Sequence, residues 1–343
     1  YDAVRGASAG RLATDQTLAE VDRGVNNPSF TSDGITVRNT LNDNASGQTF
    51  VGWFWNAGAN SSKTFTVKVV SDSGNKYRFD DFATSAVTLD LEEGSTYVFD
   101  QSDSSNSGHP LRFSTTSDGT HNSGSEYTTG VTTTGTPGSA GAKTTIVVAA
   151  SAPTLYYYCS SHSGMGGQAN TNDTAGASNF AGSIQSTVRA NVDAGFSIVS
   201  YTGNGTAGAT IGHDLGVAPS MVIVKNRDAS TDWSTWAKPV TDQYGAAYAV
   251  FLQSTAGAGS YAGVFNSTAP TSTVFSVGTS SSTNSNNVNY IAYCFSEVEG
   301  YSKISKYTAN GSADGTFVYT GFRPAFLLIK KINSTGTHWA MPG

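Results

Sequence analysis

The stretch SYTGNGTAGATIGHDLGVAPSMVIVKN, residues 200–226, decides the fold expected for this 343-residue chain, because its pattern occurs twice. Residues 306–331, KYTANGSADGTFVYTGFRPAFLLIKK, match it at offsets of 105 or 106. The matched positions pair Tyr201 with Tyr307, Gly216 with Gly321, Pro219 with Pro324, Lys225 with Lys330 and Trp233 with Trp339. Each copy joins a short strand, a Gly/Asn turn and a Gly-x-x-Pro entry into an apolar run, so the chain contains an internal β repeat.

A second match links the beginning of the chain to the end of the complete repeat. GITVRNTLNDNASGQTFVGWFW (34–55) aligns with VFSVGTSSSTNSNNVNYIAYCF (274–295) at a constant offset of 240. This offset exceeds one repeat length, which indicates an inserted domain. The sequence therefore predicts the second half of a β-sandwich repeat (1–58), an inserted domain (59–178), a complete repeat (183–300) and the first half of another (301–343).

Short apolar runs bounded by turn residues occur throughout the chain. In TFTVKVV, the side chains of Phe65, Val67 and Val69 alternate along one face, and helical spacing is almost absent. The predicted fold class is all-β, built from β-sandwich repeats around the inserted β domain. Cys294 lies in one apolar run, NYIAYCF, so we expect it to be buried and not bonded to Cys159.

Charge and motif content exclude several classes of function. The formal net charge is −6, only 13% of the residues are charged, and no basic run is present, which argues against a nucleic-acid partner. No apolar stretch approaches the roughly 20 residues of a membrane span, so we expect no membrane insertion. His213 and His338 have no partner at catalytic spacing, and no nucleophile elbow or phosphate loop is found. We therefore expect no enzymatic activity.

The inserted domain contains LYYYCSSHSGMGGQ, residues 155–168, which carries metal-ligand types at close spacing. Copper that cycles between two oxidation states is held by two imidazoles and a thiolate, with a long axial thioether. The sequence supplies all four donors: His109 in NSGHPLRF, Cys159, His162 and Met165. His121 lies in a polar loop and is expected to be solvated. Two interpretations stay open: a site for one copper ion, and a scaffold kept for its shape without the metal.

These residues resemble a cupredoxin, and the loop spacing is closest to the amicyanin type. The resemblance extends over most of residues 59–178 and implies a Greek-key β-barrel. It also implies a type 1 copper site, with His109, Cys159 and His162 as equatorial ligands and Met165 as the axial ligand. The chain departs from the family after Met165, where GGQANTNDTAGASN is polar instead of forming an apolar closing strand.

The repeats resemble a domain of unassigned function that recurs in large structural proteins of marine tailed bacteriophages, cyanophages included. The segments that carry this resemblance are GFSIVSYTGNG, YIAYCFSEVEGYSK, YDAVRGAS and FVGWFWNAG. It implies a virion component, of a fibre or other surface appendage, whose partners are copies of itself, other virion proteins or the host cell surface. A secreted copper-binding redox protein and a glycan-binding host-attachment adhesin are the alternatives from other classes.

Each half-repeat leaves strand edges and an apolar face that need a partner. The missing half is encoded at the other end of the chain. Completion by the same chain or by a neighbouring chain is favoured over continuation into further sequence. In both favoured cases, Ile329 is predicted to lie in a sheet with, or pack against, the strand holding Trp53.

Overall fold

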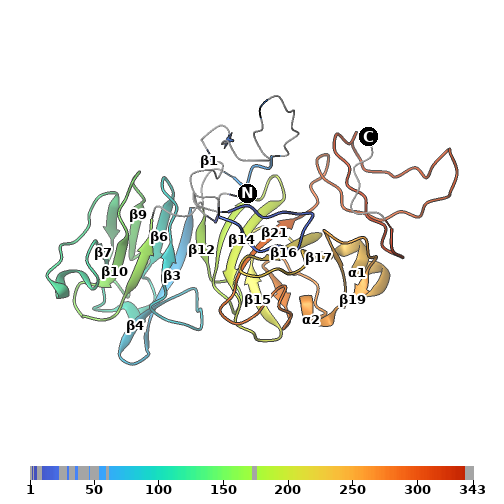
Figure 1. Cartoon of the computed structure of the whole chain (residues 1–343). Coiled ribbons are helices and arrows are strands. Elements are labelled where there is room, and N and C mark those ends of the chain that lie inside the picture. Colours follow the sequence, from blue (N-terminus) through green and yellow to red (C-terminus); the bar gives the residue numbers. More distant parts are fainter. Residues whose placement is uncertain are drawn as a thin grey trace.

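The computed structural model describes residues 62–171 and 176–336 and, before them, residues 2, 4–5, 10–22, 29–30, 35–37, 46 and 54–58. Strands dominate these residues, so the predicted all-β class is confirmed. Figure 1 shows two strand-rich bodies side by side, which we call the first sandwich (residues 62–171) and the second sandwich (residues 176–302). No helix in the described part of the chain is long and apolar enough to cross a bilayer.

The first sandwich consists of a five-stranded sheet, ordered β4-β3-β6-β9-β8, and a four-stranded sheet, ordered β5-β11-β10-β7. Its strands are β3 (Lys63–Ser71), β4 (Asn75–Phe79), β5 (Leu89–Asp90), β6 (Thr96–Asp100), β7 (Leu111–Ser114), β8 (Val131–Thr134), β9 (Lys143–Val147), β10 (Leu155–Cys159) and β11 (Gly167–Asn170). Two 3-10 turns, Ser104–Asn106 and Gly119–Asn122, interrupt the loops.

The core of the first sandwich fills the space between these two sheets. Phe65 and Val67 of β3 are fully buried, as their alternation predicted, and they join one cluster with Phe99, Tyr157 and Met165. The Greek-key β-barrel that the resemblance implied is not closed among the described residues, whose strands form two separate sheets. Alternation specifies which side chains face inward, whereas closure depends on strand pairing at the sheet edges, which alternation does not encode.

The second sandwich has a large sheet, ordered β12-β13-β14-β21-β16-β17-β18-β19, and a small one, β15-β20. Its strands are β12 (Ala177–Asn179), β13 (Ser186–Asn191), β14 (Phe196–Thr202), β15 (Ala209–Gly212), β16 (Met221–Asn226), β17 (Ser234–Ala237), β18 (Tyr248–Phe251), β19 (Gly259–Ser260), β20 (Val274–Val277) and β21 (Asn289–Phe295). Its two helices are α1 (Lys238–Tyr244) and α2 (Ala262–Phe265). Residues of the small sheet, such as Ile211 and Phe275, pack on Tyr201 and Val222 of the large one. β21 is therefore a central strand, paired with β14 on one side and β16 on the other.

The two sandwiches are joined through β12 and the residues just after it. Ala177 and Phe180 insert into the core of the first sandwich. The carboxylate of Asp214 receives hydrogen bonds from Lys63 Nζ at 3.1 Å and from Asn179 Nδ2 at 2.6 Å. Glu92 and Arg189 form an ion pair across the same joint. These contacts fix the first sandwich to the second sandwich.

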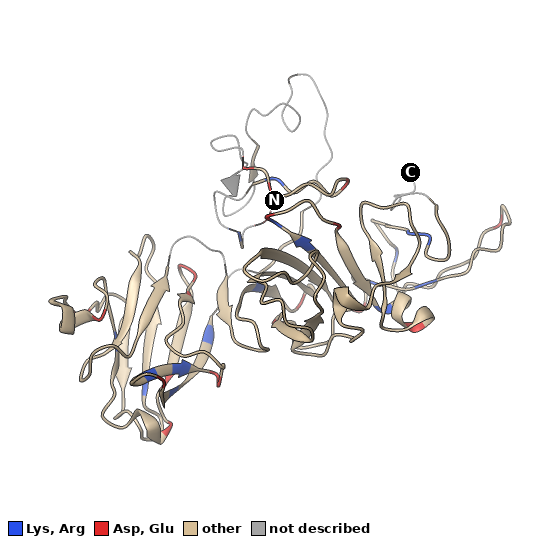
Figure 2. Ribbon diagram, turned by 60° about the horizontal axis from the view of Figure 1, so that its bottom comes forward, with Lys and Arg blue, Asp and Glu red and all other residues tan. Residues whose placement is uncertain are grey.

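The beginning of the chain covers the outer face of the large sheet. Val4, Leu12 and Ala57 share a buried cluster with Trp233 and Ile291. A short pair of strands, β1 (Ser29–Phe30) and β2 (Ile35–Thr36), belongs to the same part of the chain. Charges are scattered along the ribbon in Figure 2 and form no concentrated patch in that view.

The last part of the chain, residues 303–336, contains no strand of two or more residues within its described length. Ile329 takes part in an isolated β-bridge. Lys330 Nζ donates to the carbonyl oxygen of Ser254 at 2.6 Å, and Ala258 N donates to Ile332 O at 2.8 Å, so this end is attached to the second sandwich. Trp53 lies outside the described residues, so its predicted packing with Ile329 stays a prediction.

Candidate metal centre

The pairing of β7 with β10 brings together two candidate ligands, His109 and Cys159, that are 50 residues apart in the chain. His109 lies just before β7, and Cys159 is the last residue of β10, in register with Leu111. The hydrogen bond from Ser160 N to Pro110 O, at 3.0 Å, continues this pairing beyond the strands. His162 and Met165 follow in the turn between β10 and β11, which pair as a hairpin. A rigid strand end and a short turn therefore place all four residues at one end of the sandwich.

Three donor atoms face one another at this end. The Cys159 Sγ atom lies 3.8 Å from His109 Nδ1 and 3.7 Å from His162 Nδ1. The two imidazole rings are 4.6 Å apart between centroids. The three donor atoms all lie within 4.8 Å of one another. His109, Cys159 and His162 thus form a compact ligand cluster.

The two sulfur–nitrogen separations are those expected around one bound ion. An ion about 2.3 Å from a thiolate sulfur and about 2.0 Å from an imidazole nitrogen, with roughly 120° between the bonds, separates the two atoms by about 3.7 Å. A tetrahedral angle of roughly 109° would bring them to about 3.5 Å. The sulfur–nitrogen distances of 3.8 and 3.7 Å allow each nitrogen to share one ion with the sulfur.

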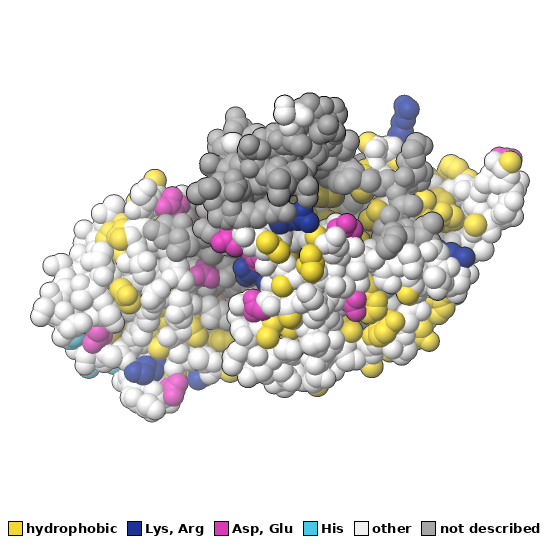
Figure 3. All heavy atoms as spheres, viewed as in Figure 1, with side chains coloured by type: hydrophobic (Ala, Val, Ile, Leu, Met, Phe, Trp, Pro, Cys, Tyr) yellow, Lys and Arg dark blue, Asp and Glu magenta, His cyan; other side chains and the backbone are white. Residues whose placement is uncertain are grey.

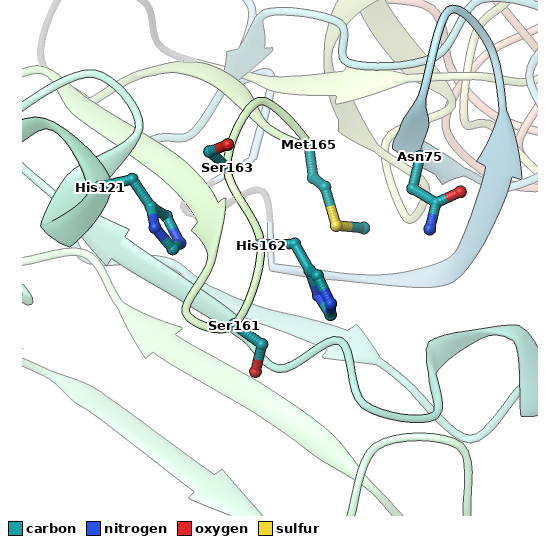
Figure 4. A pocket seen from close by; sticks show the side chains of 6 residues that line it. All are labelled: Asn75, His121, Ser161, His162, Ser163 and Met165. Carbon is teal, nitrogen blue, oxygen red and sulfur yellow. The ribbon is translucent and has the colours of Figure 1, made fainter.

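Met165 lies on the same turn but is buried, with 1% of its surface exposed. Its carbonyl oxygen accepts a hydrogen bond from Tyr77 N at 3.0 Å, which fixes this part of the turn against β4. Figure 4 shows its side chain extending from the turn toward His162. The thioether therefore lies on the same side of the turn as His162, and both residues line one pocket.

Buried polar side chains hold the backbone of His109 in place. Tyr77 donates its hydroxyl hydrogen to His109 O at 2.9 Å, and Gln101 Nε2 donates to the same oxygen at 2.8 Å. Gln101 Oε1 accepts from Leu111 N at 3.1 Å, and Asn106 O accepts from His109 N at 2.8 Å. Sequence reasoning missed Tyr77, Gln101 and Asn106, because residue type alone does not reveal which buried polar groups surround a ligand.

The surroundings change the protonation of two groups at the centre. Burial lowers the pKa of His109, and the neighbouring His162 lowers it further, so the neutral imidazole that binds metals is favoured. Burial raises the pKa of the Tyr77 hydroxyl well above its usual value, and the adjacent Cys159 adds to this effect. Tyr77 therefore stays protonated and remains a hydrogen-bond donor over the whole physiological range.

The exposed side of the cluster opens into a shallow pocket of about 510 Å³. The pocket is lined by Asn75, His121, Ser161, His162, Ser163 and Met165 (Figure 4). His121 is exposed, as expected, yet its Nε2 lies 2.9 Å from the carbonyl oxygen of Cys159. Lys76 donates to Gly164 O, and Asp118 accepts from Gly164 N at 2.9 Å, so the turn is braced from both sides. Solvent therefore reaches His162 while Cys159 stays buried.

Comparison with other proteins adds a family but no function. A family described as a domain of unknown function, DUF7483, matches residues 168–342, just over half of the chain. The match covers the second sandwich and the end of the chain, and it excludes His109, Cys159, His162 and Met165. The searches of curated proteins and of solved structures found no match. The chain belongs to the DUF7483 family.

Proposed function

We propose that the first sandwich binds a single copper ion at the cluster, with His109, Cys159 and His162 as equatorial ligands and Met165 as the axial ligand. The observation that carries this proposal is the pair of Sγ–Nδ1 distances, 3.8 and 3.7 Å, around one buried sulfur. Two imidazoles, one thiolate and a thioether are soft and borderline donors that suit copper. A structural zinc site usually has four thiolate, imidazole or carboxylate ligands, and a thioether does not supply the fourth.

When bound, copper would supply one-electron chemistry at the end of the first sandwich. The residues of the chain would do three separate tasks. β10 keeps the Cys159 sulfur away from water, Tyr77 and Gln101 fix the backbone of His109, and the polar pocket leaves His162 open to solvent. The exposed imidazole provides a route for metal loading from solution.

The direct test is a copper titration of the metal-free protein, followed by visible absorption and by metal analysis after gel filtration. We expect one equivalent of copper and the intense thiolate-to-copper absorption of a trigonal site. Cys294→Ala is a matched control, because it removes the other free buried cysteine. If the wild-type chain binds no copper, or binds it without thiolate absorption, the scaffold interpretation replaces this proposal.

We propose that the whole chain is a structural component of a bacteriophage virion, in a fibre or other surface appendage. The repeated sequence pattern and its folding into a strand-rich sandwich support this proposal, because repeated domains of this kind build extended objects. Mass spectrometry of purified virions tests it: the chain should be present in a fixed copy number per particle. Its presence only in a secreted fraction would favour a copper redox protein. Binding to host envelope glycans would favour an adhesin.

A further inference from the structure

The end of the chain exposes side chains whose counterparts in the complete repeat are buried. Tyr201, Ile211 and Val222 are 4%, 0% and 0% exposed, whereas the matching Tyr307, Phe317 and Leu327 are 47%, 85% and 49% exposed. Figure 3 shows hydrophobic side chains gathered on the half of the molecule that holds the second sandwich and this end of the chain. The same pattern of residues therefore forms a core in one copy and an exposed surface in the other.

The difference in exposure between the two copies follows from the strands that pair with the complete copy. In the second sandwich, β21 lies between β14 and β16, and β20 pairs with β15. Residues 34–55 carry the sequence pattern of β20 and β21 at the offset of 240. They are thus the segment of this chain that fits the exposed surface of residues 301–331.

One contact already joins these two segments in the corresponding positions. The rings of Trp55 and Phe326 meet edge to face, 6.5 Å apart. By the repeat offsets, Trp55 corresponds to Phe295 and Phe326 to Met221, and Met221 and Phe295 are directly opposite partners in the β16–β21 pair. The ring contact between the two ends of the chain therefore joins two residues whose counterparts are cross-strand partners in the complete repeat.

We propose that the segment of residues 301–331 and the segment that ends with Phe54 and Trp55 pair within one chain, as the corresponding segments do in the complete β-sandwich repeat. In this pairing, Phe326 lies opposite Trp55 and Leu327 lies opposite Phe54, in the register of β16 with β21. The inference is independent of the copper site, because it involves no residue of the first sandwich.

Attachment of both segments to the second sandwich favours the same chain over a neighbouring one. Arg189 donates to Gly58 O, and Asn191 Nδ2 donates to Asn56 O at 3.1 Å. At the other end, Gly336 N donates to Thr255 O at 3.0 Å, next to the bonds of Lys330 and Ile332. Two segments tethered to one body meet at a high effective concentration, so intramolecular pairing outcompetes exchange between chains.

Disulfide trapping tests both the pairing register and whether the two segments pair within one chain. Phe54→Cys combined with Leu327→Cys should give an intrachain disulfide after mild oxidation with glutathione disulfide, with the same yield at all protein concentrations. Val222→Cys is the matched positive control, because residue 222 lies opposite the native Cys294 in the complete repeat. Phe54→Cys combined with Leu328→Cys is the out-of-register control, since adjacent strand residues point to opposite faces.

Interchain disulfides whose yield rises with concentration would overturn the proposal in favour of pairing between chains. No disulfide, or an equal yield in the out-of-register variant, would overturn the register. Hydrogen exchange of the unmodified chain gives an independent measurement. Amides of residues 326–331 should exchange at least roughly tenfold more slowly than those of the turn at 310–315. Equal exchange rates would contradict the proposal whatever the variants do.

Discussion

The two sandwiches each contain one free, fully buried cysteine, and the neighbours of the two sulfurs are different. Cys294 of β21 packs among apolar residues of the second sandwich, including Val222 and Ala292. The prediction of a buried strand position for Cys294 is confirmed. Cys159 is equally buried, yet two imidazole nitrogens face its sulfur. Burial alone therefore does not distinguish a packing cysteine from a metal ligand; the atoms within 4 Å of the sulfur do.

The largest expected effect comes from removing each of the two thiols in a separate variant. Cys159→Ser should abolish the thiolate-to-copper absorption and weaken copper binding by on the order of 100-fold or more, because an equatorial ligand is lost. Cys294→Ala should retain one equivalent of copper and the full spectrum. Absorption and metal analysis check both variants. Copper binding that depends on Cys294 instead of Cys159 would reverse the comparison.

A smaller effect on copper affinity is expected from the side chains that hydrogen-bond to the backbone of His109. Tyr77→Phe removes the hydroxyl donor to His109 O while Gln101 keeps its bond, so copper affinity should fall by about tenfold. Tyr157→Phe is the matched control, because it removes a buried hydroxyl that donates to Val87 O instead. Competition titration with a chelator of known affinity gives both values. Equal losses in the two variants would indicate general destabilisation.

The buried thiol of the second sandwich should appear in the pH dependence of stability. Burial raises the pKa of Cys294 from its ordinary value of 9.0 to about 12. Below pH 9, the Cys294 thiol keeps its proton in both the folded and the unfolded chain, so its full contribution to the free energy of unfolding is present. Between pH 9 and 12, only the unfolded chain loses it, and the free energy of unfolding falls by about 1.4 kcal/mol per pH unit.

Cys294→Ala should therefore show a shallower loss of stability over this range, measured by denaturant unfolding at several pH values. Tyrosines with raised pKa values contribute to the same alkaline loss in both proteins, so the difference between the two slopes isolates the thiol. Parallel slopes would show that the environment of Cys294 does not suppress its ionisation.

The smallest effect concerns the third histidine near the cluster. His121 Nε2 contacts Cys159 O, not the sulfur, and the residue is exposed. His121→Ala should therefore change copper affinity by less than about threefold, within the range of an outer contact. The same titration checks it. A loss comparable to that of Cys159→Ser would make His121 a ligand and would require a different assignment of the cluster.

Some features of this protein could be predicted because they depend on residue type and order. Alternating apolar residues such as Phe65 and Val67 indicated strands whose inward side chains form the core. The order of His109, Cys159, His162 and Met165 indicated a candidate metal centre because few other arrangements combine these donors at such spacing. The repeat at offsets of 105 and 106 indicated two copies of one sequence pattern, and the copy at residues 200–226 contains strands.

Other features depended on contacts between residues distant in the chain. The sequence does not encode directly that β7 and β10 pair in the register that puts His109 beside Cys159, or that Tyr77 and Gln101 meet at His109 O. The two open sheets in place of a closed barrel are a result of the same kind.

The amino-acid sequence by itself determined the all-β class, the repeat and the identity of the candidate ligands, because these follow from local periodicity and side-chain chemistry. Only the tertiary structure decided the distances between the donors, the burial of Cys159 and the meeting of Trp55 with Phe326. The physical reason is that strand pairing is non-local: each register is selected by the packing of a whole sheet face, and no short segment contains that information.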